Sequence, residues 1–336
     1  MNQILPTRDP THQVIIKEIT NKTLTSLDFK GKNGEKVKLT LVKASISNTS
    51  IRANLENVSD QTVRNYVKQQ GLEVAEKILH KIQEIAKRKI KIKTIDISID
   101  WTEIPYEGEK IEGVGGSKQG YAWKYAVATT KYRNKTLMLA FLPYTDLPKE
   151  DIVKTLVEQV ISLGFRIRII ALDAGFYSNE VIDFVSQFKF IISVSRASIR
   201  KKYDGDYETN KGVRFRPVVV KRHGKYLRYG TNICTGSGSS LVKLYNKKRG
   251  FVESFFRNVK EFLPFTCSRS FVFRLVVFLL AVLIYTLYLI VRNKRFTLGL
   301  MRSLLILYLS LLSLERIDNE IYNRIEQYLE NCYYGG

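Results

Sequence analysis

The sequence has few of the residues that build disulfide frameworks and metal centres. Its 336 residues include three cysteines and three histidines. Both sets are scattered along the chain, at Cys234, Cys267 and Cys332 and at His12, His80 and His223. This spacing excludes a disulfide framework and a clustered zinc site, and it offers little for a Ser-His-Asp triad.

The first ten residues, MNQILPTRDP, lack an apolar run of signal-peptide length. We therefore expect a reducing, intracellular compartment, the cytoplasm. One apolar run occurs later, where Leu275 to Val291 gives seventeen residues bounded by Arg274 and Arg292. That length is at the lower limit for a membrane span. The alternative, which we favour, is a helix buried between a sheet and the C-terminal helices, with no membrane partner.

Acidic residues are scarce relative to basic ones, with 32 Asp and Glu against 54 Lys and Arg and a net charge of +22. Such an excess indicates a polyanionic partner, of which nucleic acid is the usual one. Residues 189–249 hold sixteen basic and three acidic residues. This stretch is the main phosphate-binding candidate, and its alternative is a solvated basic surface.

The N-terminal part of the chain is only partly legible. Residues 1–43 contain β-like pieces such as VKLTLVK between Gly and Asn turns. Ser59 is an N-cap candidate for a short polar helix near residues 57–70, as in the second helix of a helix-turn-helix, although short capped helices are common. Apolar residues at helical spacing predict an amphipathic helix over 72–89.

The central part predicts a mixed α/β domain. Ile95, Ile97 and Ile99 alternate with Asp96, Ser98 and Asp100, the pattern of a strand with one apolar face and one carrying carboxylates. The glycines of residues 113–120 predict a hairpin rather than a phosphate loop, because the Gly-Lys-Ser/Thr element is missing. The elements expected next are strands at 121–130 and 135–142, a helix at 149–163, a strand at 166–173 and a helix at 179–188 capped by Ser178.

The segment from Tyr245 to Lys260 combines Arg249, Glu253 and Lys260 at spacings of four and seven. On one helix these spacings place the three side chains within about 40° of one another. The structural alternative is an exposed helix with ion pairs. Asp100 and Asp173 are expected at strand ends, where the functional crevice of an open sheet lies, so the two aspartates could converge with Glu253.

These motifs resemble the DDE transposases of bacterial and archaeal insertion sequences, in the group with a Tyr-Arg-Glu-Lys signature around its glutamate. The matching segments are IDWT at 99–102, LDAGFYS at 172–178 and residues 245–260. Three residues separate Tyr245 from Arg249, where the family has two. Trp101 occupies the place of a small residue after the first aspartate, and Asp96, on the same strand face, is the alternative to Asp100.

The resemblance implies an α/β fold with a ribonuclease H-like mixed sheet flanked by helices. It implies that Asp100, Asp173 and Glu253 are the catalytic residues and bind two divalent ions, Mg²⁺ or alternatively Mn²⁺. The reactions implied are cleavage at transposon inverted-repeat ends and strand transfer to target DNA, by a nucleoid-associated enzyme that pairs two ends as a homodimer. The DNA-binding residues expected are Arg249, Lys260, Tyr245, Arg257, Lys247 and Lys248.

The predicted organisation has four parts. They are a mainly helical N-terminal DNA-binding region at 1–90, a catalytic domain at 91–195 and 239–292, a basic insertion at 196–238 and a C-terminal helical region at 293–336. Two other classes of protein stay open at this point. One is a transposase-derived DNA-binding regulator without catalysis, and the other is a membrane protein with a basic cytoplasmic domain.

Overall fold

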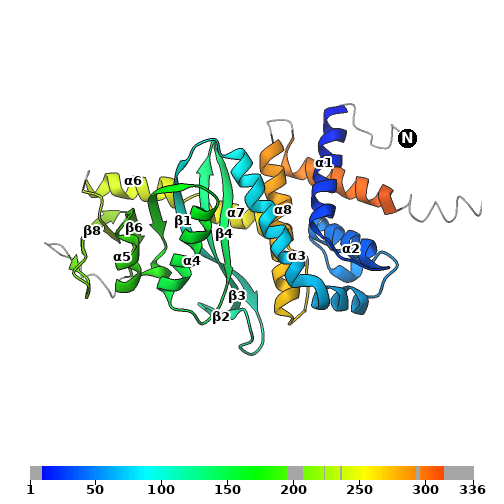
Figure 1. Ribbon diagram of the computed structural model, residues 1–336, viewed down its shortest axis with the longest axis horizontal. Helices are drawn as coiled ribbons and strands as arrows, with labels where there is room; N and C mark the ends of the chain where they lie inside the picture. Colours follow the sequence, from blue (N-terminus) through cyan, green and yellow to red (C-terminus); the bar gives the residue numbers. More distant parts are fainter. Residues whose placement is uncertain (1–9, 196–206, 223, 235–236, 293–295, 314–336) are drawn as a thin grey trace, which may run out of the picture. The chain divides into compact units, whose positions relative to one another are not determined.

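The computed structural model describes residues 10–195, 207–222, 224–234, 237–292 and 296–313. The chain divides into two compact units, one formed by residues 1–78 and 261–336 and the other by residues 79–260 (Figure 1). Part of the expected basic insertion, at 196–206, and the end of the expected C-terminal region, at 314–336 with Cys332, lie outside the described residues. The four predicted domain boundaries stay a prediction.

The first unit is helical, which agrees with the expected helical N-terminal and C-terminal regions. Its elements are α1 (Pro10–Ser26), α2 (Gly34–Ser47), the 3-10 helix η1 (Ile51–Asn54), the first part of α3 (Asp60–Lys89), α8 (Phe271–Val291) and a helix at Leu298–Ser313. The β-like segment VKLTLVK lies inside α2, where Val37, Leu39 and Leu41 are all buried. Because α2 is covered on more than one side, its apolar residues do not show a helical period.

The two helices expected at 57–70 and 72–89 form one continuous helix, α3. Ser59 caps it as predicted, since the backbone N–H of Thr62 donates to Ser59 Oγ at 3.0 Å. Gly71 allows the helix to continue against α8, because a Cβ there would lie 2.5 Å from Val272 Cγ1. Residues 48–59, which include η1, connect α2 to α3, and they are longer than the usual turn of a helix-turn-helix. That motif stays a prediction.

The apolar run forms the 21-residue helix α8, which by length and composition alone could cross a membrane. In the structure 78% of its most apolar window is buried. The helices α1 and α2 pack against it, and α3 approaches it at Gly71. The expected packing between a sheet and the C-terminal helices stays a prediction. Its all-round apolar surface is thus used as the core of a helical unit.

The second unit contains a mixed sheet of nine strands flanked by helices, as predicted. The strands are β1 (Thr94–Tyr106), β2 (Val114–Ser117), β3 (Gly120–Tyr132), β4 (Lys135–Pro143), β5 (Arg166–Leu172), β6 (Lys189–Ser193), β7 (Tyr207–Glu208), β8 (Arg214–Arg222) and β9 (Lys225–Thr231). The strand order is β2-β3-β1-β5-β6-β9-β8-β7, with β4 also paired to β3. The β1–β5 and β5–β6 pairs are parallel, and β1–β3 and β3–β4 are antiparallel.

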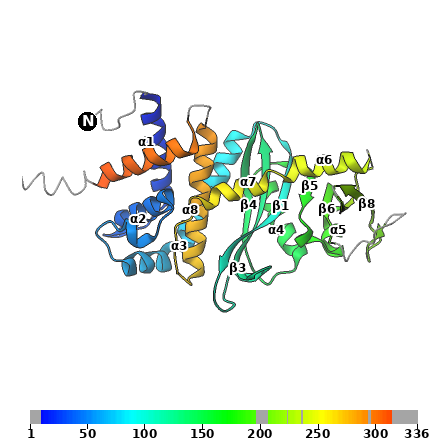
Figure 2. The same cartoon turned by 180° about the vertical axis from the view of Figure 1, so that it is seen from behind.

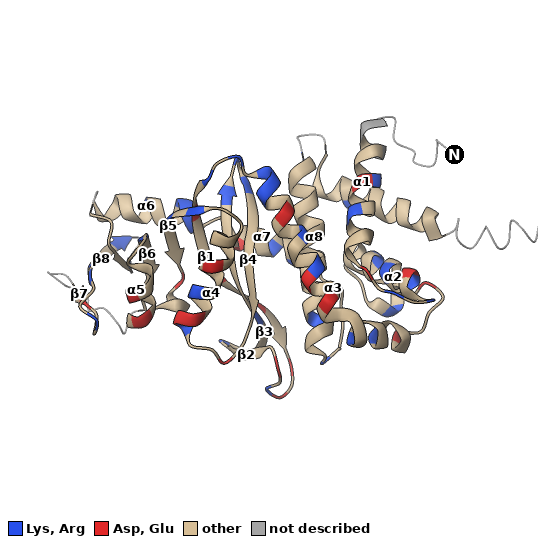
Figure 3. Ribbon diagram, in the orientation of Figure 1, with Lys and Arg blue, Asp and Glu red and all other residues tan. Residues whose placement is uncertain are grey.

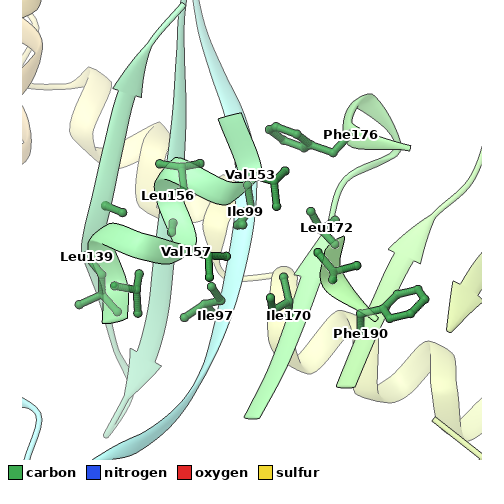
Figure 4. Packing of buried hydrophobic residues seen from close by; sticks show 14 of the residues in the cluster. Ile97, Ile99, Leu139, Val153, Leu156, Val157, Ile170, Leu172, Phe176 and Phe190 are labelled. Carbon is green, nitrogen blue, oxygen red and sulfur yellow. The ribbon is translucent and has the colours of Figure 1, made fainter. Parts of the chain in front are cut away.

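Helices cover both faces of the sheet. On one face, α4 (Lys149–Ser162) and α5 (Asn179–Val185) enclose the main core, in which Val153 and Leu156 pack over Ile97 and Ile99 (Figure 4). On the other face, α6 (Gly238–Arg249) packs its Leu241 on the sheet. The helix α7 (Val252–Lys260) follows α6 directly (Figure 2). Alternation along each strand sends neighbouring side chains to opposite faces.

The strand expected to end near Asp100 continues to Tyr106, because β3 pairs with it from Ser98 to Tyr106. Asp100 instead marks the point where the parallel neighbour β5 stops, since the last β1–β5 pair is Ile99 with Leu172. The glycine-rich segment forms β2 and its turn into β3, which confirms the predicted hairpin. The fold therefore places Asp100 inside a long strand and beside the end of a short one.

Candidate active site

Asp100 reaches the site because β1 alternates. Its isoleucines Ile97 and Ile99 face α4, so Ser98 and Asp100 face α6 and α7. Asp100 is only 6% exposed. Its Oδ1 accepts a 2.9 Å hydrogen bond from the backbone N–H of Trp101, which fixes one oxygen of the carboxylate.

Asp173 is the first residue after β5 and precedes the 3-10 helix η2 (Ala174–Phe176). Its backbone N–H donates to the carbonyl of Ile99 at 3.4 Å, which extends the β1–β5 ladder by one bond. Ser178 then caps α5 as predicted, accepting from the backbone N–H of Val181. The parallel pairing of two adjacent strands thus brings Asp173 next to Asp100, although they are 73 residues apart in the chain.

Glu253 lies on a different helix from Arg249, whereas the sequence predicted one continuous helix. The chain bends at Gly250, between α6 and α7. A Cβ at Gly250 would lie 2.7 Å from the carbonyl oxygen of Asn246, so this turn requires glycine. The short helix α7 is strongly amphipathic, with Val252, Phe255, Phe256 and Val259 buried and Glu253, Arg257 and Lys260 exposed.

Arg249 connects the three carboxylates. Its Nη2 lies 2.9 Å from Asp100 Oδ2 and 3.1 Å from Asp173 Oδ1, and its Nη1 lies 3.6 Å from Glu253 Oε1. The Nε of Arg249 is buried and finds no hydrogen-bond partner within the described part of the chain. The guanidinium group is therefore held by charge at the centre of the acids while one of its donors stays unsatisfied.

The electrostatics of the cluster follow from this burial. Burial, followed by the nearby charge of Asp173, raises the pKa of Asp100 to about 6, although the charge of Arg249 opposes the shift. Burial alone would lower the pKa of Arg249. The interactions with Tyr245, Asp100 and Asp173 outweigh burial and raise this pKa above its usual value. At neutral pH the carboxyl group of Asp100 is therefore mostly ionised beside the charged guanidinium of Arg249.

The three acids and Arg249 line one cleft of about 1160 Å³. Side-chain exposure increases from Asp100 at 8%, through Asp173 at 34%, to Glu253 at 68%. Basic and aromatic side chains from several elements complete its walls, among them Trp101, Lys124, Tyr144, Lys149, Arg257 and Lys260. The structure thus brings together all the predicted catalytic residues in a cleft that basic side chains also line.

Of the six predicted DNA-binding residues, Arg249 pairs with the three acids, and the other five separate into three groups. Arg257 and Lys260 line the cleft and form no ion pair with the described residues. Tyr245 is buried, and its hydroxyl donates to the carbonyl of Leu172 at 3.2 Å, so it supports the strand that precedes Asp173. Lys247 and Lys248 line a second, smaller pocket beside the first.

Lys124 and Tyr144 also line the cleft, although no sequence pattern indicated them. Lys124 lies opposite Glu103 in the β1–β3 register and forms a 3.1 Å ion pair with it. Its Nζ also lies 5.2 Å from the centre of the Trp101 ring. The cross-strand charge pair is a usable signal, but only once the register of the two strands is known.

Asp96, the alternative to Asp100, does not join the three acids. Arg168 donates two 2.8 Å hydrogen bonds to it from Nε and Nη2, and Lys248 also pairs with it. Although burial acts to raise it, these bonds hold the pKa of Asp96 below its usual value. Asp96 therefore anchors two cations, Arg168 of β5 and Lys248 of α6, and stays apart from the group of three acids.

We expect Asp96→Asn to destabilise the protein without removing a catalytic group. Losing the charge that Arg168 and Lys248 share should lower the free energy of unfolding by about 1–3 kcal/mol. Denaturant unfolding of the variant at neutral pH measures this loss. The exposed Asp151→Asn on α4 is the matched control, and an equal effect in both variants would contradict the anchoring role.

The three acids offer ligand atoms that suit divalent metal ions. Carboxylate oxygens are the ligands that Mg²⁺ prefers, and Asp100, Asp173 and Glu253 all converge on one positive group. Within the described ranges no three His, Cys, Asp or Glu side chains already form a metal-binding group. The residue types therefore fit a metal site in which the guanidinium of Arg249 stands in for the cation.

Comparisons with known proteins point to one family and one fold. The family described as "Transposase DDE domain" matches residues 92–287, and a "Domain of unknown function (DUF4322)" matches residues 6–69. Among solved structures, the fold is similar to that of piggyBac transposase, determined by cryo-EM in a synaptic complex with hairpin DNA. That match has a TM-score of 0.55 and 13% identity, and it covers 91% of this chain and 79% of the other. No curated protein matches this chain.

The mixed sheet with N-terminal and C-terminal helices is thus similar in fold to the piggyBac transposase, and the two matches together support a DNA transposase. The chain belongs to the transposase DDE domain family, whose match covers more than half of its length. Members of this family generally use divalent metal ions.

Proposed function

We propose that this protein cleaves DNA at transposon inverted-repeat ends and transfers the resulting strand to target DNA, with divalent metal ions as cofactors. The observation that carries the proposal is the convergence of Asp100, Asp173 and Glu253 on one cationic group in an open cleft. Their motifs support assignment to the bacterial and archaeal group with the Tyr-Arg-Glu-Lys signature.

Each residue has a role that its position supports. Asp100, Asp173 and Glu253 would hold two Mg²⁺ or Mn²⁺ ions, which supply activation of the attacking oxygen and stabilisation of the leaving oxygen. Arg257 and Lys260, exposed on the same face of α7 as Glu253, bind the phosphates next to the scissile bond. Tyr245 holds the end of β5, and so the backbone that precedes Asp173, in place.

The test is cleavage of a labelled duplex that carries the inverted repeat flanking the coding sequence. We expect nicking at the repeat boundary with Mg²⁺ or Mn²⁺ and none with EDTA. Nicking that is unchanged by EDTA would contradict the metal requirement.

Two ends must be paired for transposition, so we also propose that the protein acts as a homodimer. We propose that it is located in the cytoplasm and associated with the nucleoid.

A second candidate function is a DNA-binding regulator of transposase descent. The observation that favours it is that Arg249 already pairs with all three carboxylates, as a permanent counter-ion would. Specific binding of the repeat duplex without nicking in any metal would support the regulator over the enzyme.

A membrane location is the third possibility, through α8. Because 78% of the most apolar window of α8 is buried, we expect the protein to be recovered without detergent. Sedimentation of a cell lysate prepared without detergent measures this. Recovery of the protein only from the detergent-extracted pellet would favour a membrane protein.

A further inference from the structure

A second pocket lies beside the cleft of the acids, on the same face of β1. It measures about 360 Å³ and contains one acidic residue, Asp96. Five basic residues line it, from four separate elements or turns, at Lys131, Arg133, Arg168, Lys247 and Lys248. Basic segments of the ribbon gather around the start of β5 and the turn between β3 and β4 (Figure 3). The pocket therefore carries a net positive charge of about four at neutral pH.

Two of the five basic side chains pair with Asp96, and the other three can pair with a bound anion. Asp96 holds Arg168 and Lys248 in fixed positions. Lys131, Arg133 and Lys247 form no ion pair with any described residue. Cations that converge without a carboxylate partner repel one another, and they gain most from an anion placed between them.

The walls of the pocket also carry aromatic rings. Lys131 Nζ lies 5.7 Å from the centre of the Phe251 ring, and the guanidinium of Arg133 lies 5.4 Å from that of Tyr132. Both Phe251 and Tyr132 line the pocket. Basic residues interleaved with aromatic rings are typical of surfaces that follow a nucleic-acid strand.

Arg133 occupies a backbone conformation that its side chain does not favour. It has φ of 47° in the two-residue turn between β3 and β4, and Asn134 follows with φ of 61°. Glycine and asparagine fill such hairpin turns at lower cost than arginine. Strained backbone positions cluster at functional sites, so the strain at Arg133 indicates that its charge has a function at the rim of this basic pocket.

The position of the pocket relative to the acids is set by β1. Asp96 and Asp100 are four residues apart on one strand face, which corresponds to about 13 Å. The junction of α6 and α7 lies between them, fixed where Ser98 Oγ donates to the carbonyl of Lys248. One strand of duplex DNA advances by about 3.4 Å per nucleotide along the helix axis, so 13 Å spans about four nucleotides.

We propose that this pocket binds a backbone phosphate of the DNA strand whose reacting phosphate lies at the three acids, about four nucleotides away. The inference rests on the proposed function, because it places the reacting phosphate in the neighbouring cleft. Lys131, Arg133 and Lys247 contact the phosphate, while Asp96 keeps Arg168 and Lys248 directed toward it. The pocket thereby sets which phosphate reaches the acids.

The experiment compares the wild type with Lys131→Gln/Arg133→Asn on repeat duplexes in which single phosphates are replaced by uncharged methylphosphonates. Asparagine tolerates the backbone conformation at residue 133, so the variant is expected to fold. The control Lys87→Gln/Lys154→Gln removes the same charge from exposed residues of the same unit that do not line the pocket. Binding is measured by fluorescence anisotropy in EDTA at several salt concentrations.

For the wild type and the control we expect one methylphosphonate, about four nucleotides from the cleavage position, to weaken binding about tenfold. In the pocket variant that substitution should have no further effect, and the slope of log affinity against log salt should fall by about one per lost phosphate contact. A variant that keeps the wild-type dependence at every position, while cleavage continues, would overturn the pocket alone. A wild type that neither binds nor nicks the repeat would overturn the proposed function as well.

Discussion

Replacing any one of Asp100, Asp173 or Glu253 by its amide is expected to reduce metal-dependent nicking at least about a thousandfold, or about 4 kcal/mol in the barrier. Each substitution removes a carboxylate from the group that surrounds Arg249, and with it a charged ligand that a divalent ion requires. The rate of nicking of the labelled repeat duplex under single-turnover conditions measures the loss.

Binding of the same duplex should change by less than about threefold in these variants, because phosphate contacts provide most of the affinity. Asp151→Asn, on the opposite face of the sheet, is the control for the loss of one acidic residue. A variant that nicks at the wild-type rate would exclude its residue from the active site. The result therefore tests each acid separately from the DNA-binding surface.

Arg249→Gln is expected to make the stability of the protein depend on divalent metal ions. Without Arg249, the buried Asp100 and its neighbour Asp173 lose their common counter-ion, which should cost about 3–5 kcal/mol of unfolding free energy in EDTA. Mg²⁺ can compensate for that loss, because a ligand that binds only the folded state stabilises it. Thermal unfolding at increasing Mg²⁺ should show a larger rise in Tm for the variant than for the wild type.

The control is Lys247→Gln, which removes an exposed cation from the same helix and should leave the metal dependence unchanged. Equal stabilisation of the wild type and Arg249→Gln by Mg²⁺ would show that the guanidinium and the metal do not compete. This measurement requires no DNA, so it is independent of the cleavage experiment.

The core elements of the second unit were predictable because their signals are local. The alternation around Ile97, the Ser178 cap and the amphipathic pattern of α4 each lie within a few residues. The extension of β1 beyond Asp100 was not predictable, because it depends on pairing with β3, which is distant in the sequence. The helix α2 was not predictable for a different reason. It is buried on several sides, so its apolar residues do not recur at the spacing of an amphipathic helix.

The candidate site was predictable in its membership but not in its arrangement. Spacing alone grouped Arg249 with Glu253, yet the bend at Gly250 places them on two helices. The alternation of the strand did not distinguish Asp96 from Asp100, which share one strand face, and only the resemblance of the IDWT motif favoured Asp100. The distinction comes from their partners, since Asp96 meets two cations of its own and Asp100 shares Arg249 with Asp173.

The two faces of β1 have different roles, one in the hydrophobic core and one at the candidate site. Ile97 and Ile99 contribute to the core on one side, while Ser98 and Asp100 serve the active site on the other. A shift of one residue in the pairing of β1 would turn Asp100 toward the hydrophobic core under α4 and turn the isoleucines toward the cleft. The burial that fixes the register of this strand therefore also fixes the face on which Asp100, the first candidate acid, lies.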